Sequence, residues 1–196
     1  MPVVMLILGE KSMVSLHTPV CDFGAPAIDF ELPGTDGQTW NLASCRGPKG
    51  LLVMFICNHC PYVKAIRDRL VRDTRELKAL GVNSVAIMAN DAVQYPEDSF
   101  ENMRRVAREF DFPFPYLMDE SQAVARAYGA VCTPDFFGYN ADLQLQYRGR
   151  LDASGKQPAE PGARRELFEA MRAVAETGRG PAEQTASIGC SIKWKD

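Results

Sequence analysis

Cys57 and Cys60 form a Cys-x-x-Cys motif, a spacing at which two thiols can close a small disulfide ring and open it again. The motif lies between an apolar run and a segment with helical periodicity. Cysteine reacts as its thiolate, and a helix N-terminus stabilises an anion through its partial positive charge and free N–H groups. We therefore expect Cys57 to cap the helix as the exposed nucleophile, and Cys60 to lie shielded inside the first turn.

His59 lies inside the motif and is the candidate that tunes it. A protonated imidazole or an N–H aimed at Cys57 would lower the pKa of that thiol into the range of about 3.5 to 7.5 that activated thiols show. The alternative is an exposed His59 with little effect. A zinc site needs four ligands, and beyond His17 and Cys21 the sequence offers no further pair at ligand spacing. We expect no metal.

The segments around the motif predict a β-α-β unit. Leu51–Ile56 is a continuous apolar run, typical of a central strand covered on both faces. Pro61 opens the next segment, where its missing N–H costs little, and apolar residues recur at helical spacing until Gly81. Val82–Ala89 is a second buried strand. The motif then lies at the carboxyl edge of the first strand, where open α/β sheets hold their chemistry.

The other segments complete an α/β pattern, a mixed central sheet flanked by helices on both faces. Alternating polarity around a Pro-Gly turn predicts an N-terminal β-hairpin from 25–32 and 38–42. Periodicity and helix stop signals predict three more helices, over 96–110, 121–128 and 164–176. A short strand at 116–118 and a second hairpin, from 134–139 and 143–148, account for the rest.

Composition limits the partners of the protein. The chain has 196 residues, 46% of them hydrophobic and 24% charged, which suits one domain. The net charge is −3, and Lys and Arg alternate with acids, so we expect no nucleic-acid partner. The longest apolar runs, 3–8 and 51–56, are much shorter than the roughly 20 residues that span a bilayer, so we expect no membrane partner.

The six cysteines bear on the compartment. Residues 1–12 lack the basic region and cleavage site of a signal peptide, so we expect a cytoplasmic protein with catalytic or buried thiols. Met13 could be the natural start, in which case residues 1–12 would be poorly ordered or pack as an extra strand. We predict an N-terminal extension at 1–23, one domain at 24–180 and a polar C-terminal tail at 181–196.

Three stretches carry a resemblance to a known family: CNHCPYVKAI after LLVMFI, CTPDFF at 132–137, and the C-terminal SIGCSIKWK. Together they resemble the thioredoxin superfamily, and more narrowly its bacterial peroxiredoxin-like or redoxin branch, related to AhpC/TSA. The resemblance implies a thioredoxin-like fold. It implies a cis Thr133–Pro134 bond that turns the backbone of Thr133 toward an extended substrate segment. Asn58 and Pro61 would also contact the substrate.

Two departures from that family narrow the chemistry. Leu51 stands six positions before Cys57, where thioredoxin keeps a buried Asp that assists proton transfer, so proton handling must differ. Gly50 and Met54 occupy the positions at which peroxiredoxins keep the Pro and Thr of their peroxide pocket. Peroxidase activity is therefore the weaker enzyme hypothesis. An x-His dipeptide between the cysteines resembles the strong oxidant DsbA more than thioredoxin.

We interpret the protein as a thiol-disulfide oxidoreductase whose only redox group is the Cys57–Cys60 couple, without a bound cofactor. Its partners would be protein thiols or disulfides, or small thiols, and its electron donor is left open. Cys132 and Cys190 are either inert small apolar residues or auxiliary thiols in a relay. The alternatives are a thiol peroxidase, a metal-binding thioredoxin-like module, and a binding domain with a vestigial motif.

Overall fold

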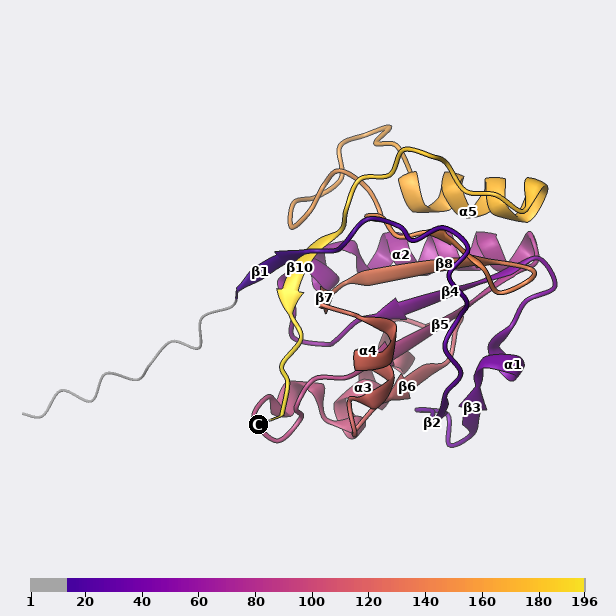
Figure 1. Ribbon diagram of the computed structural model, residues 1–196. Coiled ribbons are helices and arrows are strands. Elements are labelled where there is room, and N and C mark those ends of the chain that lie inside the picture. Colours follow the sequence, from indigo (N-terminus) through magenta and orange to yellow (C-terminus); the bar gives the residue numbers. More distant parts are fainter. Residues whose placement is uncertain (1–13, 196) are drawn as a thin grey trace, which may run out of the picture.

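The central element of the fold is a five-stranded mixed sheet, seen in Figure 1 in the computed structural model, which describes residues 14–195. The strand order is β6-β5-β4-β8-β9, and the strands span, in that order, Tyr116–Met118, Val82–Met88, Gly50–Phe55, Asp135–Asn140 and Leu145–Tyr147. β4, β5 and β6 are parallel, whereas β8 and β9 are each antiparallel to their neighbours. The predicted mixed sheet is confirmed.

β4 separates two apolar cores, because successive side chains of a strand point to opposite faces of the sheet. Leu52 and Met54 share one core with α2 (Pro61–Ala79) and α5 (Glu166–Thr177). The odd-numbered residues of β4 share the other with the short helices α1 and α4, which span Leu42–Cys45 and Ala123–Tyr128. Every residue of β4 is buried, and helices cover both faces, as predicted (Figure 1).

The helix predicted over 96–110 is divided in two. A single 3-10 turn, η1 (Pro96–Asp98), precedes α3 (Phe100–Glu109), and Ser99 between them is extended at φ −57° and ψ 152°. The Ser99 side chain accepts a hydrogen bond from the Asn102 amide, so it caps α3. No helix within residues 14–195 is both long enough and apolar enough to cross a membrane.

The predicted N-terminal hairpin is present but shorter than expected. It consists of β2 (Glu31–Pro33) and β3 (Thr39–Asn41), which pair antiparallel. The turn between them comprises the predicted Pro-Gly segment, and α1 follows β3 directly, with the Asn41 side chain accepting from the Ser44 amide at 2.8 Å. This hairpin lies against the core that contains α1 and α4.

A second, three-stranded sheet was not predicted. It has the order β1-β10-β7, formed by Ser15–His17, Ile188–Ser191 and Cys132–Thr133. β10 belongs to the segment expected as a polar tail, and it pairs antiparallel with both neighbours (Figure 1). The prediction for residues 1–12 lies outside the described residues, and the domain boundaries stay predictions.

Gly189 shows how tightly β10 is held against β7. A Cβ at this position would overlap the carbonyl oxygen of Thr133. We expect Gly189→Ala to lower the free energy of unfolding by about 1 to 3 kcal/mol, the usual cost of overpacking, measured by urea denaturation. Ser191→Ala, two residues along the same strand, is the control. Wild-type stability of Gly189→Ala would contradict the close packing of β10 on β7.

Candidate active site

The Cys-x-x-Cys motif lies between the end of β4 and the start of α2, as predicted, but the helix begins later than expected. α2 starts at Pro61, and Cys60 is its N-cap residue, with φ −61° and ψ 124°. Proline favours the first helical position and disfavours helical geometry in the residue before it. Cys60, not Cys57, therefore caps the helix, and the prediction for the capping residue is wrong.

Both cysteines of the motif are buried. Cys57 is 2% exposed and Cys60 is 0% exposed, so the prediction of an exposed Cys57 is wrong. The loop around Pro134 covers them: the Cys57 thiol lies 3.3 Å from the Thr133 hydroxyl, and the Cys60 thiol donates to the Thr133 carbonyl oxygen at 3.1 Å. The Thr133–Pro134 bond is cis, as the resemblance implied. One residue of this loop thus contacts both thiols.

The backbone of Thr133 is not open to a partner, contrary to the prediction. Thr133 pairs with Cys190 across β7 and β10, and Cys132 pairs with Ser191. The Ser187 hydroxyl also donates to the Pro134 carbonyl oxygen at 2.9 Å. The chain's own C-terminal segment occupies the edge at which a substrate strand was expected to pair.

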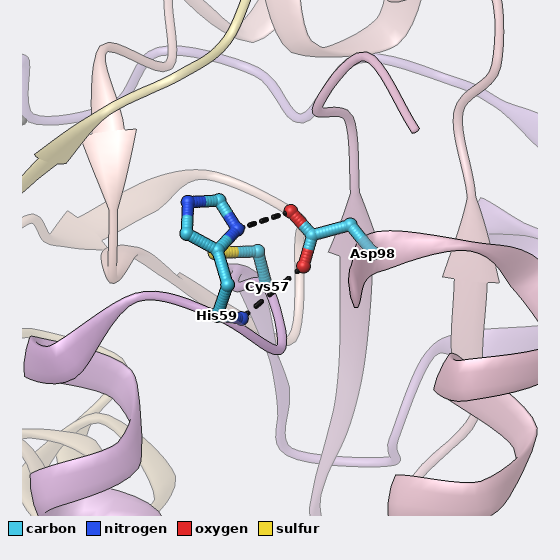
Figure 2. Close-up of side chains that lie close together, drawn as sticks. All are labelled: Cys57, His59 and Asp98. Atoms are coloured by element: carbon cyan, nitrogen blue, oxygen red, sulfur yellow. Dashed lines mark hydrogen bonds and ion pairs between the residues drawn. The ribbon is translucent and has the colours of Figure 1, made fainter. Parts of the chain in front are cut away.

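His59 is held by an acid that the sequence analysis missed. Its Nδ1 lies 2.6 Å from Oδ2 of Asp98 (Figure 2). Its ring also stacks on Tyr95, with 5.2 Å between the ring centroids. Asp98 comes from η1 and is fully buried. Among the described residues, His59 Nε2 is buried without a hydrogen-bond partner. Nothing in the local sequence marks Asp98, because it lies 39 residues after His59 and reaches the motif only through the fold.

Asp98 also orders the backbone of the motif. Its Oδ1 accepts from the amides of Asn58 at 2.8 Å and His59 at 3.3 Å, and its Oδ2 accepts from Asn90 Nδ2 at 2.8 Å. With Nδ1 of His59 as a fourth donor, the buried carboxylate is fully engaged. The loop between the two cysteines is therefore built around one acid.

Asn58 and Pro61, expected to contact substrate, have different surroundings. The Asn58 side chain is 6% exposed, donates to the Glu97 carbonyl oxygen at 2.9 Å and accepts from the Tyr116 hydroxyl at 3.1 Å. It is engaged inside the protein. Pro61 is partly exposed at the start of α2.

The charge of the motif falls on the second cysteine. Burial, followed by hydrogen bonding with Cys60 and the negative charge of Asp98, raises the pKa of the Cys57 thiol well above its usual value. Hydrogen bonding with the thiols of Cys190 and Cys57 lowers the pKa of Cys60. The predicted low pKa of Cys57 is wrong here, because the neighbouring thiols stabilise a thiolate on Cys60 instead.

The raised pKa of Cys57 should determine how fast this thiol is alkylated at each pH. We expect the reaction of Cys57 with iodoacetamide to rise about tenfold per pH unit and to keep rising above pH 9, since only the thiolate reacts. Labelling at increasing pH, resolved by peptide mass spectrometry, measures this rate. Cys132, a buried thiol whose pKa is also raised by burial, is the internal control. A Cys57 rate that levels off near neutral pH would contradict the raised pKa.

Cys57, His59 and Asp98 offer three possible metal-ligand atoms within 4.8 Å of one another (Figure 2). A catalytic zinc site can consist of three protein ligands and a water. Here, however, the Asp98 carboxylate already forms a hydrogen bond with Nδ1 of His59. It also accepts hydrogen bonds from three further N–H groups. A metal would have to displace these bonds, so the set fits a hydrogen-bonded His59–Asp98 pair beside the Cys57 thiol better.

The two candidate auxiliary thiols differ in position. The Cys190 sulfur lies 3.0 Å from that of Cys60, so the fold brings Cys190 into the site. Cys132 is equally buried, but its thiol donates to the Pro134 carbonyl oxygen at 3.6 Å. The sequence alone did not separate these two residues.

A cavity of about 180 Å³ lies beside the Pro134 loop and was not predicted. Its walls include Tyr62 and Ile66 of α2, Pro134, Leu151 and Ser187. The lining is mostly apolar, with Arg150 and Asp152 as charged members. It adjoins the site through Pro134 and Tyr62, and neither cysteine of the motif is among its lining residues.

Comparisons with known proteins agree on the fold. Residues 23–154 of this chain match the protein-family model described as "AhpC/TSA family". A crystal structure of an uncharacterized conserved protein from Geobacillus kaustophilus is 45% identical, with a TM-score of 0.88, and covers 94% of this chain and 98% of that chain. A hypothetical protein from Sinorhizobium meliloti 1021 is 37% identical, with a TM-score of 0.86 and coverages of 91% and 98%.

A more distant structure extends the likeness in fold. The thioredoxin domain of a thiol-disulfide oxidoreductase from Bacteroides vulgatus is 15% identical, with a TM-score of 0.55, and covers 66% of this chain and 89% of that chain. At this identity the likeness concerns the fold alone. A comparison with curated proteins found no match.

Proposed function

The chain belongs to the AhpC/TSA family of thioredoxin-fold redoxins, and we propose that within this family it works as a thiol-disulfide oxidoreductase. The observation that carries the proposal is the contact of both thiols of the motif with Thr133, beside Pro134. Two cysteines that share one loop and the start of one helix can exchange a disulfide with little movement of the backbone. No bound cofactor is needed.

In the reducing direction, the Cys57 sulfur attacks one sulfur of a substrate disulfide. The Cys57 proton passes to Nε2 of His59, a buried ring nitrogen without a hydrogen-bond partner among the described residues. A nitrogen of this ring lies within 4.8 Å of the Cys57 sulfur. A mixed disulfide forms, and the leaving sulfur departs as a thiolate that takes up a proton. Asp98 holds Nδ1 of His59 as the N–H form, so Nε2 has the free lone pair.

Cys60 then resolves the mixed disulfide. Its thiolate attacks the Cys57 sulfur, the second substrate thiol leaves, and the Cys57–Cys60 disulfide remains. The lowered pKa of Cys60 supports this role, because the attacking thiolate is present without a further base. A stabilised thiolate also stabilises the reduced couple, which favours the reverse direction, oxidation of substrate dithiols.

Small thiols and disulfides suit this site better than an extended peptide. Cys57 is 2% exposed, and β10 already pairs with Thr133, so a substrate strand would have to displace it. The cavity beside Pro134, of about 180 Å³, leaves space for a small molecule instead. We therefore propose a low-molecular-weight thiol as the substrate class.

The test uses the reduced full-length chain with two disulfide substrates, glutathione disulfide and insulin. We expect the protein to reduce glutathione disulfide and to form Cys57–Cys60 in equal amount, as followed by thiol titration and mass spectrometry. Insulin should react at least about tenfold more slowly if β10 blocks an extended partner. Absence of exchange with both substrates would refute the proposed function, whereas faster reduction of insulin would refute the substrate class alone.

A thiol peroxidase is the second candidate, favoured by the family match itself. Gly50 and Met54 stand where the peroxiredoxin pattern would have its Pro and Thr, which weakens it. Consumption of hydrogen peroxide by the reduced protein, faster than by free cysteine at the same thiol concentration, would favour this candidate.

A further inference from the structure

The C-terminal strand places a third cysteine against the motif. The sulfur atoms of Cys60 and Cys190 lie 3.0 Å apart, although the residues are 130 positions apart in sequence. Cys190 pairs with Thr133, the residue whose hydroxyl and carbonyl groups contact Cys57 and Cys60. Three cysteines and one threonine therefore form a single buried cluster, in which Cys60 lies next to Cys190.

The strand that carries Cys190 is anchored on both sides of it. Before it, the Ser187 amide donates to the Thr18 hydroxyl at 3.0 Å, and the Thr18 amide donates to the Ser187 carbonyl oxygen at 3.0 Å. After it, the Lys193 amide donates to the Asn90 side chain at 2.9 Å, and the Lys193 carbonyl oxygen accepts from Gln122 at 2.9 Å. The position of Cys190 beside Cys60 is thus built into the fold.

We propose that Cys190 is a third redox residue, which takes over the disulfide from the motif by pairing with Cys60. The proposal rests on the proposed exchange function. In the step, the Cys190 sulfur attacks the Cys60 sulfur of a Cys57–Cys60 disulfide. The Cys60–Cys190 bond forms, the Cys57–Cys60 bond breaks, and the proton of Cys190 passes to the departing Cys57 thiolate. No electrons enter or leave the protein, so no further oxidant is required.

The consequence concerns Cys57. After the step, Cys57 is again a thiol and can attack another substrate, while the oxidising equivalent is held between Cys60 and Cys190. A thiol reductant that opens Cys60–Cys190 returns the protein to its fully reduced state. Cys57 and Cys190 are each 2% exposed and Cys60 is fully buried, so both disulfides would lie inside the protein.

The first experiment removes the competing partner of Cys60. Cys57→Ser is oxidised with diamide, quenched in acid, alkylated under denaturing conditions and mapped by mass spectrometry. We expect the Cys60–Cys190 disulfide in most molecules. Cys57→Ser/Cys190→Ser should lose it, and Cys57→Ser/Cys132→Ser should keep it, because Cys132 faces Pro134. A Cys57→Ser protein in which Cys60 stays reduced, or pairs with Cys132, would overturn the proposal.

The second experiment uses the chain with all three cysteines in place and does not depend on substrate turnover. The protein is oxidised with one equivalent of diamide, and the Cys57 thiol is then quantified after alkylation. We expect a measurable fraction of Cys57 to be labelled in the wild type, and at least a several-fold loss of this label in Cys190→Ser. Equal labelling of Cys57 in both proteins would overturn the relay.

The outcomes separate this inference from the proposed function. A Cys60–Cys190 disulfide in a protein that fails to reduce glutathione disulfide would contradict the oxidoreductase proposal and leave the pairing intact. Exchange activity without this disulfide would contradict the relay alone.

Discussion

Replacing Cys57 with serine is expected to reduce the rate of disulfide exchange at least about 1,000-fold, because the variant lacks the sulfur that forms the mixed disulfide. A serine hydroxyl at this buried position cannot substitute, since an alcohol does not undergo thiol-disulfide exchange. The measurement is the initial rate of glutathione disulfide reduction, with circular dichroism to confirm folding. Cys132→Ser, at a buried thiol that donates to the Pro134 carbonyl oxygen, is the matched control and should retain the rate.

Cys60→Ser should behave differently from Cys57→Ser. It keeps the attacking thiol but lacks the resolving one, so a mixed disulfide between Cys57 and the small thiol should accumulate to nearly one per molecule. Intact-protein mass spectrometry would detect the added mass. The opposite result would be an adduct in Cys57→Ser, at Cys60, and none in Cys60→Ser. In that case the low pKa of Cys60 makes it the attacking residue, and the roles proposed for the two cysteines are reversed.

Replacing Asp98 with asparagine is expected to affect both stability and rate. The amide keeps the shape of the carboxylate, but its NH₂ group must face one pair of donors, either the amides of Asn58 and His59 or the side chains of His59 and Asn90. Leaving buried donors unpaired costs about 1 to 3 kcal/mol of folding free energy. Urea denaturation measures this loss.

The same change should also slow exchange. Without the carboxylate, Nδ1 of His59 is no longer held as the N–H form, and loss of a positioned base costs about 100-fold or more in rate. Glu97→Gln is the matched control, because it removes an exposed acid from the same 3-10 turn. His59→Ala should reproduce the loss in rate. A destabilised Asp98→Asn protein with an unchanged pH dependence of exchange would restrict Asp98 to a structural role.

Local patterns in the sequence were enough to predict the frame of the site. The run Leu51–Ile56 has no polar residue, and it is indeed a strand buried on both faces. Pro61 and the apolar spacing after it predicted α2, and the Pro-Gly turn predicted the β2-β3 hairpin. Each of these signals lies within one element, because hydrophobic period, turn residues and caps act over a few neighbouring residues.

The tertiary structure decided which groups meet at the motif. Asp98 and Cys190 lie 39 and 130 positions away from the motif residues that they contact. Cys190 was a candidate auxiliary thiol by residue type, but no local pattern predicts that either residue reaches the motif. β10 is four residues long, and its pairing with β1 and β7 joins three distant segments, so alternation within it predicts little. The polar composition of residues 181–196 therefore predicted a tail and not a strand.

The ionisation of the two cysteines also depends on contacts that local sequence patterns do not predict. From the sequence, Cys57 was expected to be exposed and acidic, because a helix N-terminus and His59 follow it closely. In the folded chain, Cys57 is buried beside Thr133, and the thiols of Cys190 and Cys57 form hydrogen bonds with Cys60. Residue type and local periodicity were enough to predict a Cys-x-x-Cys pair at the end of β4. Only the tertiary structure decided which of the two sulfurs holds the charge, because burial and hydrogen bonds from distant segments set a pKa.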